Sequence, residues 1–126
     1  MALIYMIHHL LSHNDGEDWL RVNQCFMEQL SCLARKFNSV REGELTLLDK
    51  TMLMHCSSMM VGAKHNNDEL PIIVLGGAGG RMKTGRVIDY KDKPERQLCR
   101  LFMSMMDKME VRPKTFGDAQ KMLEEV

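Results

Sequence analysis

Apolar and polar positions alternate with a helical period over residues 17–38. Acidic residues stand at the start of this segment, and Arg35 and Lys36 stand near its end, which suits the helix dipole. The pattern predicts an amphipathic helix whose apolar stripe covers a flat apolar layer, for which strands are the available partner. The stripe consists of Trp19, Val22, Phe26, Leu30, Leu33 and Phe37.

A second helical pattern predicts a helix over residues 94–110. Proline is tolerated in the first turn of a helix, so Pro94 can open it. The spacing of Asp92 and Glu95 resembles a capping box, in which side chains and backbone amides bond reciprocally. The apolar face of this helix comprises Leu98, Leu101, Phe102, Met105 and Met109. A short helical end that runs through Met122 and Leu123 is also predicted.

Short apolar runs without a helical period predict the strands of the fold. These runs are residues 1–7, 51–56, 72–75 and 86–90, the last being an alternating edge segment. The run 72–75 is apolar throughout, which is typical of a strand covered on both faces. Pro71 can precede it because the first residue of a strand need not donate to the ladder. We expect one α/β domain with roughly three to four strands and two main helices.

The composition of the 126-residue chain excludes several classes of partner. Seventeen basic and seventeen acidic residues cancel, so no basic field attracts nucleic acid or an anionic membrane. No apolar run approaches the roughly 20 residues that a membrane span needs. No Lys or Arg precedes the apolar run 1–7, which predicts a strand rather than a signal peptide. We therefore expect no nucleic-acid partner, no membrane partner and a cytoplasmic setting for the chain as it stands.

Sulfur-containing residues are numerous, with four cysteines and thirteen methionines. The cysteines show no zinc or redox spacing, and Cys25 and Cys32 lie two turns apart on one helical face. They are interpreted as small core residues in a reduced compartment. The methionines are interpreted mainly as core filler. The alternative is a Met-rich apolar surface that binds a protein partner, or a second copy in a homo-oligomer.

Histidines are the main candidates for chemistry. His8, His9 and His13 lie close together, and neutral imidazole is a ligand for zinc, copper, iron and nickel. A solvated polar loop before a helix is the alternative interpretation of this segment. His65 and Asp68 lie in a second polar loop, which enters the predicted strand 72–75.

A glycine run follows this strand and predicts a tight turn with positive backbone dihedral angles. It does not fit a phosphate-binding loop, because Met82 rather than glycine precedes Lys83 and no helix is expected next. A weak anion site is the alternative, since turn amides and a neighbouring guanidinium attract anions. Its members are Gly77, Gly79, Gly80 and Arg81.

Several short motifs occur in an order that resembles one bacterial protein family. The motifs are His8-His9-Leu10-Leu11-Ser12-His13, Leu47-Leu48-Asp49, Met59, Gly62, His65-Asn66, Asp68, Leu70-Pro71, the glycine run, Gly85-Arg86, Pro94 and Phe116-Gly117-Asp118. Their order is similar to the C-terminal portion of an exported family, domain of unknown function 1552, which is abundant in planctomycetes. That family distantly resembles the alkaline phosphatase and sulfatase superfamily. The resemblance extends over nearly the whole chain from His8 onward.

The resemblance implies a small, partial Rossmann-like α/β sandwich whose metal ligands come from loops at strand ends. It implies that His9 and His13 form the first ligand group and that Ser57 lies in the second. His65 and Asp68 would complete the metal site. A divalent ion held there, such as zinc, manganese or calcium, would activate water or a nucleophile for hydrolysis of phosphate or sulfate esters.

The chain departs from the family pattern at positions that matter for metal binding. Val61 stands at an acidic position of the second segment, and Asn67 replaces a second imidazole. Cys56 and Ser58 replace glycines, and the preceding half of the family is absent. We therefore expect residues 1–126 to be a fragment or shortened relative, a half-domain with an eroded metal site that acts as a non-catalytic binding or interaction module. A metal-dependent hydrolase and a purely structural domain are the alternatives.

Overall fold

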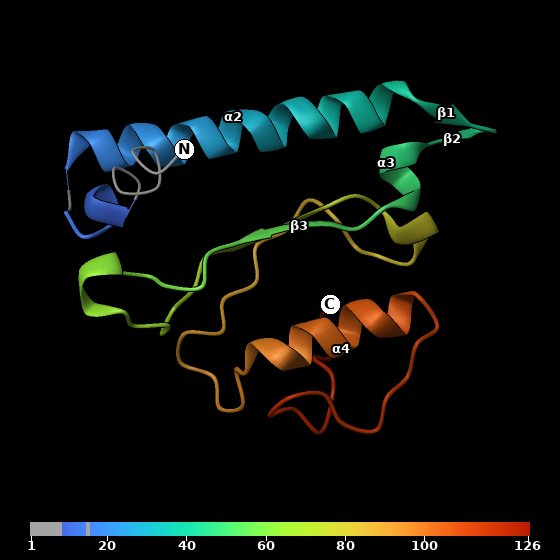
Figure 1. Cartoon of the computed structure of the whole chain (residues 1–126). Helices are drawn as coiled ribbons and strands as arrows, with labels where there is room; N and C mark the ends of the chain where they lie inside the picture. The colour runs from blue at the N-terminus through green and yellow to red at the C-terminus, as the bar shows by residue number, and fades with distance from the viewer. Residues whose placement is uncertain (1–8, 15) are drawn as a thin grey trace. The chain divides into compact units, whose positions relative to one another are not determined.

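The computed structural model describes residues 9–14 and 16–126 (Figure 1). The chain divides into two compact units. Unit 1 consists of Met1–Phe37 and Met54–Val74, and unit 2 consists of Asn38–Leu53 and Leu75–Val126. Helices and short strands occur together, so the fold is broadly α/β, as the pattern predicted. The predicted strand over residues 1–7 lies outside the described residues.

Helix α2 spans Glu17–Ser39 and confirms the helix predicted over residues 17–38. Its first turn is acidic and its last turn holds Lys36, so both ends carry charges that oppose the helix dipole. None of the described side chains of α2 is buried, and the stripe residues Phe26 and Leu33 remain 44% and 36% exposed. The apolar stripe is therefore partly covered rather than fully covered.

Strands β3, Leu53–Cys56, and β4, Ile72–Leu75, pair in a two-stranded sheet. Both strands were predicted from their apolar runs, and β4 has the predicted bounds. The prediction that β4 is covered on both faces is wrong, because Ile73 is 39% exposed and β3 is the only strand paired with it in the described chain. A short apolar run also occurs in two-stranded ribbons, so the absence of alternation did not show that the strand is buried on both faces.

A hairpin in unit 2 consists of β1, Arg41–Glu42, and β2, Leu45–Thr46, which pair antiparallel. Helix α3, Leu47–Lys50, follows directly and begins with a capping box. The Thr46 hydroxyl accepts a hydrogen bond from the Asp49 amide at 3.1 Å, and the Asp49 carboxylate accepts one from the Thr46 amide at 2.8 Å. The bond from the Thr46 backbone is the main cause that holds the pKa of Asp49 below its ordinary value.

The glycine run forms a tight turn in unit 2, as predicted. Gly76 has a φ of 101°, and a Cβ there would lie 2.1 Å from the Thr51 carbonyl oxygen. Glycine is required because both the positive φ and the close approach of the backbone exclude a side chain. The turn continues as the short helix η2, Ala78–Gly80, which packs against α3.

Helix α4 spans Leu98–Lys108 and begins later than the helix predicted over residues 94–110. Glu95 has a left-handed φ of 58°, so the predicted capping box of Asp92 and Glu95 does not form. Glu95 instead accepts from Lys121 at 2.5 Å, and this bond is the main cause that lowers the pKa of Glu95. The buried apolar residues of the described chain are Ala78, Leu101, Met103 and Ala119.

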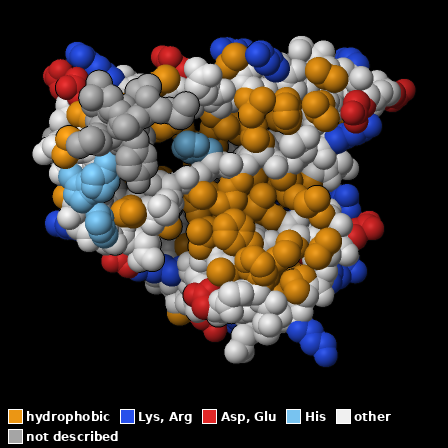
Figure 2. Space-filling view, viewed as in Figure 1, with side chains coloured by type: hydrophobic (Ala, Val, Ile, Leu, Met, Phe, Trp, Pro, Cys, Tyr) orange, Lys and Arg blue, Asp and Glu red, His pale blue; other side chains and the backbone are white. Residues whose placement is uncertain are grey.

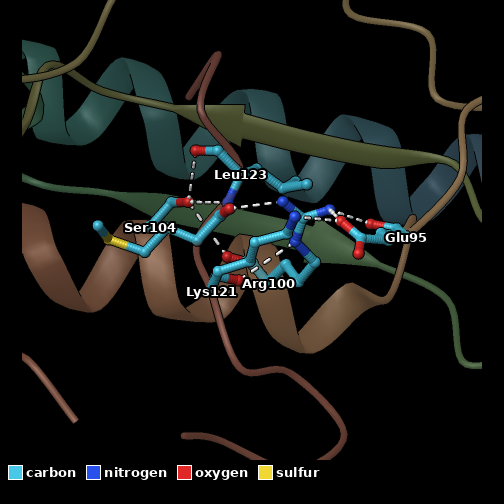
Figure 3. Close-up of polar contacts among 6 residues, drawn as sticks. Glu95, Arg100, Ser104, Lys121 and Leu123 are labelled. Atoms are coloured by element: carbon cyan, nitrogen blue, oxygen red, sulfur yellow. Dashed lines mark hydrogen bonds and ion pairs between the residues drawn. The ribbon is translucent and has the colours of Figure 1, made fainter. Parts of the chain in front are cut away.

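The C-terminal segment is tied to α4 by two buried side chains, Arg100 and Ser104 (Figure 3). The Arg100 guanidinium donates to three backbone carbonyl oxygens. These acceptors belong to Lys121 at 3.2 Å, Met122 at 2.7 Å and Glu95. The Ser104 hydroxyl accepts from the Leu123 amide at 2.9 Å. Because these side chains bond the backbone here, the predicted helical end at 122–123 does not form. We call this arrangement the C-terminal clamp.

Two further predictions are wrong. Residues 86–90 form no strand in the described chain, and Val87 is 97% exposed. Cys25 is exposed and Cys32 is half-buried, so neither is a core residue, and all four cysteines are free thiols. No helix among the described residues is long and apolar enough to cross a membrane.

Candidate functional site

Three histidine rings, those of His9, His13 and His65, meet within unit 1. The Nε2 atoms of His13 and His65 lie 3.3 Å apart, although the two residues are 52 positions apart in the sequence. Their ring centroids are 5.0 Å apart, and the centroid of His9 lies 4.7 Å from that of His13. The ring planes meet at 70° and 60°, so the rings contact edge to face rather than stacking. We call these three residues the histidine cluster.

A helical turn over residues 9–12 positions two of these rings. His9 and His13 are four residues apart, a spacing that puts side chains on the same face of a helix. The Ser12 hydroxyl donates to the His9 carbonyl oxygen at 2.8 Å, and the His13 amide donates to the Leu10 carbonyl oxygen at 3.3 Å. These bonds satisfy carbonyl groups at the end of the turn and fix the backbone that carries both histidines.

The third ring is positioned by the loop between β3 and β4. A 3-10 turn, η1, spans Gly62–Lys64 and is followed by His65 in the left-handed conformation, with φ 50° and ψ 31°. The His65 amide donates to the Gly62 carbonyl oxygen at 3.3 Å. Val61 and Asn66 form a bridge, and the Val61 amide donates to the Asn66 side chain at 3.0 Å. These bonds hold a backbone conformation that non-glycine residues seldom adopt.

The histidine cluster is open to solvent. His9 and His65 are exposed and His13 is half-buried. The space-filling view shows histidine side chains together at the surface of the molecule (Figure 2). A ligand can therefore reach this group of rings from solvent.

The other residues expected in the metal site do not join the cluster. Asp68 is exposed, and within the described chain it forms no hydrogen bond or ion pair with the three rings. The Ser57 hydroxyl accepts from the Met59 amide at 3.2 Å, inside its own loop. Across residues 9–14 and 16–126, no group of three or more His, Cys, Asp or Glu side chains is arranged to hold a metal ion. The structure thus gathers the three imidazoles without a complete set of ligands around one point.

The spacing of the two close nitrogens nevertheless fits one edge of a tetrahedral metal site. Two Zn–N bonds of about 2.0–2.1 Å at the tetrahedral angle separate their nitrogens by roughly 3.3–3.4 Å. The Nε2 atoms of His13 and His65 are 3.3 Å apart. The same distance suits an N–H···N hydrogen bond between two neutral rings, whose donor depends on the tautomers. The geometry is compatible with both roles.

The donor atoms discriminate among the ions expected from the sequence. Calcium takes about six to eight oxygen ligands, whereas the cluster offers imidazole nitrogen. Manganese favours carboxylate, carbonyl and water oxygen. Zinc binds imidazole nitrogen in four-coordinate sites and also accepts water as a ligand. The residues present therefore fit zinc better than manganese or calcium.

The residues of the weak anion site bond among themselves and their neighbours in unit 2. The Gly77 amide donates to a carbonyl of α3 at 3.3 Å, and the Gly80 amide donates to the Gly77 carbonyl at 2.9 Å. The Arg81 guanidinium donates within the turn at 3.2 Å and pairs with Glu110 at 3.2 Å. Gly79 lies inside η2 with a φ of 68°. An anion bound here would have to displace these bonds.

Two residues that shape the histidine cluster were not singled out as functional from the sequence. Asn66 closes the loop with its side chain, and Gly62 lies at the start of η1. Both residues belong to the ordered motifs, which assign neither of them a role. The available signal was modest, because Gly and Asn are common in turns for several different reasons.

No protein-family model, curated protein or solved structure matches the chain. The resemblance to the phosphatase-like family therefore stays a prediction.

Proposed function

We propose that the chain is a non-catalytic metal-binding module that holds a zinc ion between His13 and His65, with His9 beside this pair. The observation that carries this proposal is the 3.3 Å separation of the His13 and His65 Nε2 atoms. Residues 52 positions apart are not neighbours by chain connectivity, so two separate backbone features are needed to bring these nitrogens together. The His9 ring lies beside this pair, with its centroid 4.7 Å from that of His13.

Metal binding explains the cluster better than ester hydrolysis does. A hydrolase needs a group beside the metal that orients substrate or moves a proton. In the described chain, Asp68 does not contact the rings, and Val61 and Asn67 stand where the resembled family has a carboxylate and an imidazole. No specific observation therefore favours the metal-dependent hydrolase as a second function.

The wider proposal is that the chain is a shortened relative of the C-terminal half of a Rossmann-like, alkaline-phosphatase-type domain that serves as an interaction module. The order of the motifs supports this relationship, as does the position of His65 in the loop between the paired strands β3 and β4. Exposed methionines support a protein partner or a second copy. They are Met59, Met60, Met109 and Met122. Size-exclusion chromatography with light scattering tests this role, and a strictly monomeric chain would count against self-association.

Calorimetric titration of the full chain tests zinc binding. We expect one zinc ion per chain and no heat with calcium. We expect the His13→Asn and His65→Asn variants to bind zinc at least tenfold more weakly, because each removes one of the two close nitrogens. Asparagine is suitable at position 65 because it tolerates the left-handed conformation. His55→Asn is the matched control, since His55 is a histidine of the same unit that lies on β3 rather than in the cluster.

The proposal would be overturned if both cluster variants kept a zinc affinity within twofold of the wild type. An equal loss of affinity in His55→Asn would also contradict it, because the effect would then not belong to the cluster.

A further inference from the structure

Gly62 allows the two halves of the histidine cluster to approach each other. A Cβ atom built on Gly62 would lie 1.9 Å from the Ser12 carbonyl oxygen and 2.8 Å from the Ser12 carbonyl carbon. Real Cβ atoms essentially never come within 3.0 Å of such atoms. Both obstructing atoms belong to the backbone, so no side-chain rotation relieves the overlap. The turn that carries His65 therefore packs backbone on backbone against the segment that carries His13.

This need for glycine is steric rather than conformational. Gly62 is not one of the glycines with a positive φ, so its backbone conformation is open to other residues. Gly16 has an ordinary φ as well, and no atom of the described chain beyond its sequence neighbours lies within 4 Å of the place its Cβ would take. The two glycines of unit 1 thus differ in the contact and not in the conformation. A methyl group at each position isolates the effect of the contact.

We infer that Gly62 is the positioning residue of the histidine cluster, and that it sets the His13–His65 separation in favour of tetrahedral metal ions. The inference rests on the proposed function and adds the class of ion that the site selects. Tetrahedral zinc separates two nitrogen ligands by roughly 3.3–3.4 Å. Adjacent nitrogen ligands of an octahedral or square-planar ion with similar bond lengths are only roughly 3.0 Å apart. The observed 3.3 Å matches the tetrahedral value.

A methyl group on residue 62 displaces one half of the cluster. Ordinary contact begins at 3.4 Å, whereas the Cβ of an alanine at position 62 would lie 1.9 Å from the Ser12 oxygen. Residue 62 and Ser12 must therefore move apart by about 1.5 Å. The His65 amide donates to the Gly62 carbonyl oxygen across one short turn, so a displacement of residue 62 also displaces His65. Its nitrogen and that of His13 then no longer meet on one ion. The separate imidazoles bind metals in the Irving–Williams order, which does not place zinc above nickel.

The test uses two variants of the full chain, Gly62→Ala and Gly16→Ala. Each is titrated separately with zinc and with nickel. We expect zinc affinity to fall at least tenfold in Gly62→Ala and the ratio of zinc to nickel affinity to fall toward one. Gly16→Ala should stay within twofold of the wild type in both. Cobalt(II) supplies a spectroscopic readout, because the strong visible absorption of tetrahedral cobalt should appear in the wild type and Gly16→Ala and vanish in Gly62→Ala. A merely structural role of Gly62 would lower both affinities without changing their ratio.

A Gly62→Ala chain with the zinc affinity and metal preference of the wild type overturns the inference, while the loss in His13→Asn and His65→Asn still supports the proposed function. Unchanged zinc binding in both histidine variants overturns the proposed function instead. If circular dichroism shows that Gly62→Ala does not fold, the wild type decides the question by nuclear magnetic resonance. A nuclear Overhauser contact between the Gly62 α protons and Ser12 supports the inference, and its absence contradicts it.

Discussion

The histidine cluster of unit 1 and the C-terminal clamp of unit 2 both join segments that are distant in sequence, but they differ in how far their polar groups are satisfied. In the clamp, the buried Arg100 guanidinium donates to three carbonyl oxygens and pairs with Glu95 at 3.5 Å. In the cluster, the rings of His9 and His65 are exposed and reachable from solvent. A buried cation whose donors are hydrogen-bonded stabilises the fold, whereas solvent-accessible imidazoles are available to a ligand.

Arg100→Met should produce the largest change, since it leaves three carbonyl groups of the clamp without their donor. We expect the free energy of unfolding to fall by about 3 kcal/mol, with zinc binding by the cluster unchanged. Chemical denaturation and calorimetry measure the two quantities. Arg86→Met is the control, because Arg86 is exposed and, among the described residues, bonds within its own loop, and it should change stability by less than about 0.5 kcal/mol. Equal effects of the two substitutions would show that the clamp does not stabilise unit 2.

Zinc should stabilise unit 1, which holds the histidine cluster, and leave the stability of unit 2 unchanged. At one hundred times its dissociation constant, a ligand that binds only the folded state stabilises it by about 2.7 kcal/mol. We expect amide hydrogen exchange to slow at residues 60–66 and to stay unchanged at residues 46–51 of unit 2. Uniform slowing in both units, or slowing that His65→Asn retains, would contradict binding at the cluster.

Ser104→Ala should weaken the clamp without removing its cation. The Ser104 hydroxyl accepts from the Leu123 amide at 2.9 Å and lies 3.0 Å from the Leu123 carbonyl oxygen. Losing a buried hydroxyl partner lowers the free energy of unfolding by about 1.5 kcal/mol, which chemical denaturation measures. Ser31→Ala, on the exposed face of α2, provides the matched control and should be nearly neutral. If both serines prove equally dispensable, Arg100 alone maintains the clamp.

Thr46→Ala should give the smallest effect, about 1 kcal/mol from loss of the cap of α3. The native pKa of Asp49 is lowered, so its contribution to stability is present above the unfolded-state value of 3.8 and is lost as the pH falls through the native pKa. The difference between wild type and Thr46→Ala should therefore shrink in acid. Denaturation at neutral pH and below pH 3.8 measures it, together with the carboxyl titration of Asp49 by nuclear magnetic resonance. A difference independent of pH would separate Asp49 from the cap.

The elements predicted well from the sequence are those whose own residues determine them. Helix α2 has a long periodic stripe and charges that suit its dipole, and its bounds were predicted to within one residue. Strand β4 is a short apolar run between a proline and glycines, and these local signals were sufficient.

The elements predicted poorly depend on partners elsewhere in the chain. The start of α4 was misplaced because Glu95 turns out of the helix, where Lys121 and Arg100 pair with it. The helical end at 122–123 was wrong because Arg100 bonds that backbone from 22 positions away. Spacing along the chain carries no record of such distant hydrogen bonds.

The candidate site was expected from the order of motifs and not from any local pattern. The segment of His9 and His13 was interpreted as metal ligands or as a polar loop, and the helical turn over residues 9–12 was not predicted. Gly62 was not identified as a positioning residue, because the oxygen that demands glycine belongs to Ser12, 50 positions earlier.

The left-handed conformation of residue 65 bears on how this loop can evolve. Histidine and asparagine are both enriched in that conformation, and a single base change interconverts their codons. A lineage can therefore acquire or discard the imidazole of residue 65 by one mutation that leaves the surrounding backbone undisturbed.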